Sequence, residues 1–269
     1  MPPTILALVA LLLCRLPLLC ADSPPPNMPA KENLHLFLLA GQSNMAGRGK
    51  LDAAAQTPHP RVLCLRRNLS WAPALDPLHW DKPSAGTGLG KPFAEALANR
   101  LNNVTIGLIP AACGGSPVSS WVPGCYFDQT KSHPFDDAIT RTKRALQDGT
   151  LKAILWHQGE SDSIPSKSKD YEKLLEALIL RFRAEFQSPE LPFLIGQLGQ
   201  FEGKPWNADT HLVDAAHQSL AKRMKNVRFI PIPNPVSNGD LLHFDTETLR
   251  RVGKSYAEAY FDLMAAPKP

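Results

Sequence analysis

The sequence lacks the features that mark several special classes of protein. Aromatic residues make up 7% of the chain, cysteine occurs five times in 269 residues, and 29 basic residues face 25 acidic ones, a net charge of +4. So small an excess, with no basic stripe interleaved with aromatics, argues against nucleic-acid binding. With 43% hydrophobic and 20% charged residues, the composition is that of an ordinary globular protein.

The N-terminal apolar segment is too short to span a membrane. Residues 5–14 form a run of ten apolar residues that resumes at 16–21 after Arg15, whereas a membrane-spanning helix needs about 20. The pattern favours a secretory signal peptide cleaved near Ala21, although residues 1–4 carry no basic side chain. The alternative is an N-terminal anchor or a disordered tail. We therefore expect a signal peptide at 1–21 and a secreted, extracellular protein without membrane association, in the cell wall or apoplast if the source is a plant.

Cleavage after residue 21 would leave three cysteines, Cys64, Cys113 and Cys125. An odd number permits one disulfide and one free thiol in an oxidising compartment. Cys113 and Cys125 are the preferred pair because they lie close in sequence around a glycine-rich loop, but the connectivity is not determined. The glycosylation sequons at 68–70 and 103–105 suggest a glycoprotein.

The rest of the chain alternates between short apolar runs and amphipathic segments. This alternation predicts parallel βαβ units, and hence a three-layer α/β/α sandwich with a doubly wound parallel sheet of about five strands. After a polar leader at 22–33, we expect a single domain at 34–265, with a Pro-rich surface insertion at 47–90. The predicted strands are 34–40, 104–110, 153–156, 193–198 and 227–232, and the predicted helices are 93–101, 136–147, 171–186, 212–224 and 246–263.

Polar segments follow three of the predicted strands, and a fourth precedes the last helix. They read GQSNMAG at 41–47, ACGGS at 112–116, HQGESD at 157–162 and NGDLLHF at 238–244. Because sites in open α/β sheets collect at the carboxyl ends of the strands, these segments are expected to converge.

These segments contain the parts of a serine esterase. Ser43 lies at an expected strand-to-helix turn, and His243 can act as its base, with Asp240 three residues earlier to orient the imidazole. Backbone amides of Ser43 and of Gly114 or Gly115, with the Gln158 side chain, could stabilise an oxyanion.

Each part also has an ordinary structural explanation. Ser43 could cap a helix, the two glycines could form a turn, and Asp240 with His243 could be a cap and a surface residue. The other histidines show no metal-ligand spacing, and His157, directly after a buried strand, is expected to be structural. We therefore expect neither a metal nor an organic cofactor. The occurrence of all the parts in order, at predicted strand ends, favours the catalytic interpretation.

The sequence resembles the SGNH-hydrolase superfamily, in particular its carbohydrate-esterase branch of sialate O-acetylesterases, family-six acetylxylan esterases and plant carbohydrate esterases. The resemblance rests on GQSNMAGRG at 41–49, GGSPVSSW at 114–121, WHQGESD at 156–162 and DLLHFD at 240–245. It implies Ser43 as nucleophile, Gly115 and Gln158 as oxyanion donors, and Asp240 with His243 completing the triad. Some relatives are thought to use the glutamate of the HQGE block as the acid, which makes Glu160 an alternative to Asp240.

The sequence thus predicts a serine esterase that removes O-acetyl or other small acyl groups from a carbohydrate or polysaccharide. Two alternatives remain. A lipase or thioesterase can be built on the same fold, and a sugar-binding protein can retain the triad without turnover. The sugar, the linkage, the acyl group and the oligomeric state do not follow from the sequence.

Overall fold

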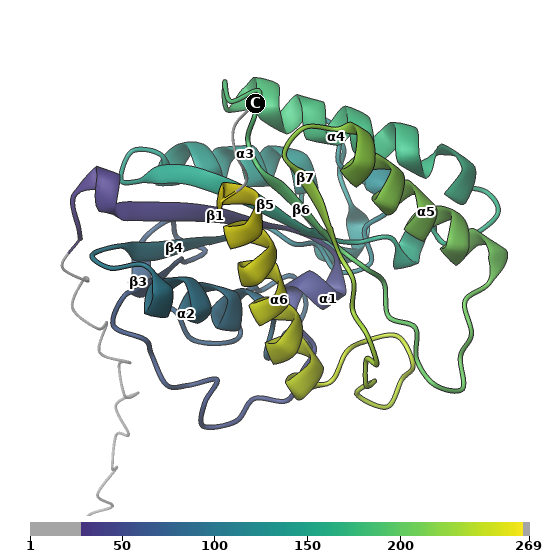
Figure 1. Ribbon diagram of the computed structural model, residues 1–269, viewed down its shortest axis with the longest axis horizontal. Helices are drawn as coiled ribbons and strands as arrows, with labels where there is room; N and C mark the ends of the chain where they lie inside the picture. The colour runs from purple at the N-terminus through teal and green to yellow at the C-terminus, as the bar shows by residue number, and fades with distance from the viewer. Residues whose placement is uncertain (1–27, 266–269) are drawn as a thin grey trace, which may run out of the picture.

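The computed structural model describes residues 28–265, so the expected signal peptide lies outside the described residues. The fold is α/β, with a seven-stranded sheet in the order β3-β2-β4-β1-β5-β6-β7 (Figure 1). The strands are β1 (Leu34–Gly41), β2 (Val62–Leu65), β3 (Trp71–Pro73), β4 (Thr105–Pro110), β5 (Thr150–His157), β6 (Phe193–Gly196) and β7 (Val227–Ile230). The helices are α1 (Ser43–Ala46), α2 (Gly90–Arg100), α3 (Pro134–Ala145), α4 (Tyr171–Glu185), α5 (Ala208–Arg223) and α6 (Thr246–Ala265).

Strand β1 lies at the centre of the sheet because its residues are almost all apolar. It pairs in parallel with β4 on one side and β5 on the other, and Leu36, Phe37, Leu38 and Leu39 are each 0% exposed. A strand covered by helices on both faces needs such a continuous apolar run, since neither face meets water.

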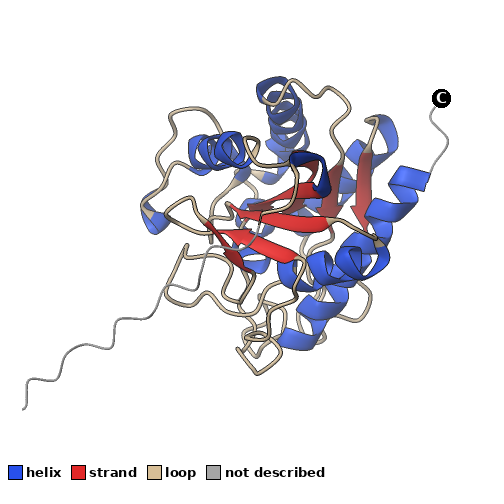
Figure 2. Ribbon diagram, turned by 90° about the vertical axis from the view of Figure 1, so that its left-hand side faces the viewer, coloured by secondary structure: helices blue, strands red, loops and turns tan. Residues whose placement is uncertain are grey.

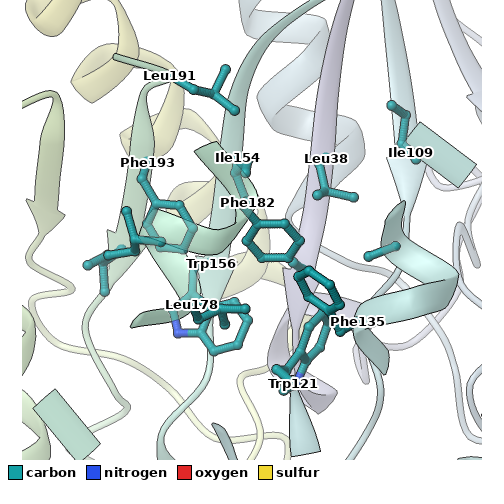
Figure 3. Packing of buried hydrophobic residues seen from close by; sticks show 14 of the residues in the cluster. Leu38, Ile109, Trp121, Phe135, Ile154, Trp156, Leu178, Phe182, Leu191 and Phe193 are labelled. Carbon is teal, nitrogen blue, oxygen red and sulfur yellow. The ribbon is translucent and has the colours of Figure 1, made fainter. Parts of the chain in front are cut away.

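Helices cover both faces of the sheet (Figure 2). One apolar cluster joins the sheet to α3, α4 and α5, and a second joins it to α1, α2 and α6. In the first cluster, Leu38, Ile154 and Phe193 lie on the face that Phe182 covers (Figure 3), and Phe135 packs beside Phe182 at a ring-centroid distance of 5.3 Å. The prediction of a three-layer α/β sandwich is confirmed. Among the described residues, no helix is long and apolar enough to cross a bilayer.

The predicted strand number and the predicted insertion need correction. Segment 47–90, expected to be a surface insertion, contributes β2 and β3 to the sheet, and β3 pairs antiparallel with β2. Strand β2 is an apolar run of four residues within a Pro-rich, poorly periodic segment, and β3 has only three residues, so neither was singled out in the sequence. Trp71 of β3 is nevertheless buried, with an exposed fraction of only 8%, and it belongs to the core. The segment is therefore partly structural and adds one edge of the sheet.

The expected Cys113–Cys125 disulfide is absent, because all three cysteines between residues 28 and 265 are free thiols. The Cys113 thiol lies 3.5 Å from Ser132 Oγ. Cys125 is half-buried, and its thiol lies near the carbonyl oxygen of Tyr126. Closeness in sequence was the only argument for the pair. Burial raises the pKa of Cys113 to about 11, so this thiol stays protonated and is a poor nucleophile at neutral pH.

Gly41, the last residue of β1, is expected to be intolerant of any side chain. Its φ is +128°, and a Cβ would lie 2.2 Å from the carbonyl oxygen of His157. Gly41→Ala should therefore lower the free energy of unfolding by well over the roughly 1–3 kcal/mol that a strained φ alone costs. Urea denaturation of the purified protein measures this.

Gly124→Ala is the matched control, because Gly124 also has a positive φ, +74°, but no atom lies within 4 Å of its Cβ position. Equal losses of stability in the two variants would show that the contact with His157 is unimportant.

Candidate active site

The loops at the carboxyl ends of β1, β4 and β5 meet as the sequence predicted. Cys113 donates its backbone N–H to Gly41 O, and Gln42 donates its own to His157 O, each at 2.9 Å. The Gln42 side-chain oxygen also accepts the Ser161 N–H at 3.3 Å. The segments that follow the three central strands are thus tied to one another at one edge of the sheet.

Ser43 begins the four-residue helix α1 directly at this edge, and its side chain meets the loop before α6. Ser43 Oγ lies 2.8 Å from His243 Nε2, and His243 Nδ1 lies 2.5 Å from Asp240 Oδ2. A carboxylate can only accept a hydrogen bond, so Nδ1 carries the proton and Nε2 is left to accept the proton of the serine. Three residues expected to act together are therefore in one hydrogen-bonded chain.

A tight turn keeps Asp240 charged and aimed at His243. Its second oxygen, Oδ1, accepts the backbone N–H groups of Leu242 and His243, both at 2.8 Å. Partial burial opposes ionisation, but the hydrogen bonds from His243 and Leu242 outweigh it and lower the pKa of Asp240. Because only three residues separate Asp240 from His243, the turn closes and the carboxylate reaches the imidazole.

Glu160, the alternative acid, makes no hydrogen bond to His243 among the described residues. It lies at the start of the short 3-10 helix η4 (Glu160–Asp162), and its Oε1 accepts the side-chain N–H of Asn44 at 2.6 Å. Its Oε2 is buried without a partner, and burial raises the pKa of this carboxyl. Glu160 therefore holds the Asn44 side chain and does not orient the imidazole of His243.

Asn44 joins helix α1, which begins at Ser43, to the loop that carries His243, a role that the sequence analysis missed. Besides Glu160, its side-chain N–H group donates to Leu242 O at 3.2 Å, and its oxygen accepts the Phe244 N–H at 3.1 Å. These bonds flank His243 on both sides along the chain. The sequence signal was the position of Asn44 immediately after Ser43, and in the structure this side chain is fully buried.

Two of the expected oxyanion donors are free to bind a substrate oxygen. Within residues 28–265, the backbone N–H groups of Ser43 and Gly115 donate to no acceptor. Gly115 has a φ of +86°, the left-handed region that favours glycine. Its carbonyl is held by the Ser161 hydroxyl at 2.8 Å, which fixes the orientation of the turn.

The other two expected donors, Gly114 and Gln158, already make hydrogen bonds within the protein, so their expected role at the oxyanion stays a prediction. The Gly114 N–H donates to Asp81 Oδ2 at 2.9 Å. The Gln158 side chain is 0% exposed, and its NH2 group donates to Ser116 O at 3.1 Å and to Asp162 Oδ2 at 2.5 Å. In this structure Gln158 therefore holds the loop that carries Gly115, and does not present a free donor.

Comparison with known proteins agrees with this geometry. The family model "Carbohydrate esterase, sialic acid-specific acetylesterase" matches residues 33–262. The chain belongs to this family. Membership makes it a carboxylic ester hydrolase and confirms the resemblance inferred from the four sequence blocks.

The relatives include a plant and a human protein. A "probable carbohydrate esterase" of Arabidopsis thaliana is 30% identical over 260 residues, which cover 89% of this chain and 94% of the relative. The crystal structure of that Arabidopsis protein superposes with a TM-score of 0.75 at 31% identity, covering 86% of this chain and 98% of the other. Human sialate O-acetylesterase is 28% identical over 188 residues, 56% of this chain but only 35% of the human protein.

A buried ion pair connects the loop after β1, which follows Ser43, to the loop that carries Gly114 and Gly115, the expected oxyanion loop. Arg48 Nη2 lies 2.6 Å from Asp81 Oδ2, with side chains 6% and 2% exposed, and the same carboxylate accepts the Gly114 N–H. A Cβ on Gly114 would lie 2.4 Å from Asp81 Oδ2 and 2.5 Å from Arg48 Nη2, so any side chain at this position would displace the ion pair. The sequence analysis did not single out Asp81, which lies in the segment expected to be a surface insertion.

His157 is buried in the sheet, which agrees with the expected structural role. It is 0% exposed, its Nδ1 lies 3.3 Å from the Tyr256 hydroxyl, and burial lowers its pKa to about 3. It therefore stays neutral under physiological conditions.

Substitution of the two carboxylates near His243 should separate their roles. We expect Asp240→Asn to lower kcat by about a thousandfold or more, because the amide no longer holds the required tautomer. Glu160→Gln should cost less than about tenfold, because the glutamine oxygen can still accept the Asn44 N–H. Steady-state kinetics on a chromogenic acetate ester measures both, and the reverse ranking would assign the acid to Glu160.

The Arg48–Asp81 pair should matter for stability and for catalysis. Asp81→Asn leaves a buried guanidinium without its counter-charge, so we expect a loss of roughly 3 kcal/mol in the free energy of unfolding. The double variant Arg48→Met/Asp81→Leu should recover part of that stability but not kcat, since the Gly114 N–H has lost its acceptor. Unchanged urea denaturation of Asp81→Asn would show that the pair contributes nothing.

Proposed function

We propose that this chain is a serine esterase that removes O-acetyl groups from a carbohydrate through an acyl-serine intermediate. The single observation that carries the proposal is the chain of hydrogen bonds from Ser43 Oγ through His243 to Asp240, at 2.8 and 2.5 Å. Family membership supplies the class of ester, and the two unengaged amides supply a place for the oxyanion.

In the first half of the proposed reaction, the proton of Ser43 passes to His243 Nε2 while Oγ attacks the acyl carbonyl carbon. The N–H groups of Ser43 and Gly115 stabilise the negative oxygen that forms. Asp240 stabilises the imidazolium. The carbon–oxygen bond to the sugar then breaks, and His243 returns the proton to the departing sugar hydroxyl.

In the second half, water replaces the sugar. His243 removes a proton from this water, whose oxygen attacks the acyl-serine, and the same two amides stabilise the second oxyanion. Collapse returns the proton to Ser43 Oγ and releases the carboxylic acid. The described residues supply the nucleophile, base and oxyanion donors for every step, and the mechanism as proposed uses no metal or cofactor.

A small cavity lies beside the turn that carries Asp240 and His243. It measures about 190 Å³ and is lined on one side by Glu160 and by Leu241 and Leu242 of the triad turn. Sites for drug-sized ligands are larger, about 300–1,000 Å³. We propose that the acyl group enters this cavity, whose volume suits a short chain better than the long chain of a lipase or thioesterase substrate.

We further propose secretion, with cleavage near residue 21 and a single catalytic domain at 34–265. Two features of the described residues support this compartment. Asn68 and Asn103, the acceptors of the two sequons, lie on exposed turns that a glycan could reach. N-terminal sequencing of secreted protein would test the cleavage site.

Removal of the nucleophile is the direct test of the mechanism. We expect Ser43→Ala to lower kcat/KM on p-nitrophenyl acetate by at least about a thousandfold, because no other hydroxyl contacts His243 among the described residues. The wild-type protein should prefer the acetate to the butyrate and should release acetate from acetylated xylan.

Ser255→Ala is the control, because Ser255 lies on α6 and its hydroxyl, within the part of the chain that the structure describes, donates only to Arg251 O. It should retain full activity. Equal activity of Ser43→Ala and the wild type would exclude Ser43 as nucleophile. A wild type inactive on every ester, yet able to bind acetylated oligosaccharides, would favour the sugar-binding alternative.

A further inference from the structure

A second cavity lies beside the loop that carries Gly114 and Gly115. It measures about 350 Å³, within the range of small-molecule sites. Ala112 and Cys113 form part of its wall, and Gly114 and Gly115 follow them directly. Two residues of chain span at most about 7 Å, so a group bound here would be close to the reacting ester. Asp81 lines the same wall and holds the Gly114 N–H.

A buried guanidinium without an ion-pair partner faces this cavity. Arg141 is 6% exposed, and its side chain donates to Pro110 O at 2.7 Å and to Leu65 O at 2.6 Å, both neutral carbonyls. Among the described residues it makes no ion pair with a carboxylate; Asp137 also lines the cavity, but its oxygen accepts the His133 N–H. Burial lowers the pKa of Arg141 to about 10, which still leaves it charged at neutral pH. A buried positive charge of this kind would be stabilised by a bound anion.

Further cationic side chains extend from the cavity toward the oxyanion loop. Lys82 Nζ lies 3.6 Å from the Cβ position of Gly115 and donates to Gln129 Oε1 at 2.9 Å. Arg67 and Lys131 lie on the exposed rim, although Lys131 is also paired with Asp128. The cavity also has two carboxylates in its wall, Asp81, which is paired with Arg48, and Asp137, so an acidic group would be attracted chiefly by Lys82 near Gly115 and by Arg141.

The remaining lining residues suit a sugar. The Trp80 ring packs against the Arg141 guanidinium at 4.3 Å and is 37% exposed, so part of its apolar surface can contact the C–H groups of a pyranose ring. His79 is 4% exposed, and neither of its ring nitrogens has a hydrogen-bond partner among the described residues. This unpartnered imidazole can exchange hydrogen bonds with hydroxyl or carboxylate oxygens of a ligand.

We propose that this cavity binds a uronic acid unit next to the acetylated sugar, with its carboxylate recognised by Arg141 and Lys82. The proposal rests on the proposed function and adds a preference for acidic over neutral polysaccharides. Acetylated polyuronides and uronate-substituted xylans are the substrate class that fits. Trp80 would support the ring of the acidic unit, and His79 would bond to its oxygens.

Binding of unacetylated oligosaccharides tests the subsite without requiring turnover. Isothermal titration calorimetry on the full chain compares trigalacturonate with xylotriose, at low salt and at 0.3 M salt. We expect trigalacturonate to bind at least about tenfold more tightly, with a preference that shrinks at high salt. Equal affinities, or a preference that salt does not change, would overturn the proposal.

Charge-matched variants locate the site. Lys82→Gln should weaken trigalacturonate binding by about tenfold, the size expected for loss of one charge-assisted contact. Lys222→Gln removes the same charge from an exposed position on α5, beside the opposite edge of the sheet, and should leave the affinity unchanged. An equal loss of affinity in both variants would show that only the overall charge of the protein matters, and would contradict the proposed subsite. Trp80→Leu should weaken both oligosaccharides, because the ring contact does not depend on the carboxylate.

Activity separates this proposal from the proposed function. Hydrolysis of p-nitrophenyl acetate without any preference of kcat/KM for acetylated polygalacturonate over acetylated xylan would uphold the esterase and refute the subsite. Preferential binding of trigalacturonate by a protein inactive on every ester would uphold the subsite and refute the esterase.

Discussion

The site depends on one hydrogen bond between segments 200 residues apart in the sequence, from Ser43 Oγ to His243 Nε2. The sheet makes this contact possible. Strand β1 lies between β4 and β5, so the turn after it opens at the centre of the carboxyl edge, where the other loops also end. The final helix then carries its preceding loop, with Asp240 and His243, back over that edge. The central apolar strand β1 and the final helix together bring the proposed nucleophile and the proposed base into contact.

Several buried polar groups restrict the movement of this contact. Asn44 bonds to Glu160 and to the backbone on both sides of His243, and the Arg48–Asp81 pair connects the loop after β1 to Gly114. Catalysis by oriented groups requires donors and acceptors fixed before charge develops, because their reorganisation would otherwise add to the barrier. The polar residues around the triad therefore contribute chiefly by holding loops from different strands in one arrangement.

The sequence predicted those parts of the structure that local pattern determines. Five strands, five long helices and the convergence of their loops followed from apolar periodicity and from glycine positions, and Asp240 was placed beside His243 because only three residues separate them. Long-range contacts were missed. Nothing local marks Asp81 as the partner of Arg48, or reveals that the Gln158 amide is engaged by Ser116 and Asp162. Strands β2 and β3 were missed because they are stable only as additions to the edge of an existing sheet.

The central claim is that Ser43 is a nucleophile activated by His243. The most direct test is covalent labelling with a fluorophosphonate, followed by peptide mass spectrometry of the wild type and of His243→Gln. The account predicts a single adduct on the peptide that contains Ser43, formed rapidly in the wild type and at least about a hundredfold more slowly without the imidazole. Labelling at another residue, or equal rates in the two proteins, would contradict it.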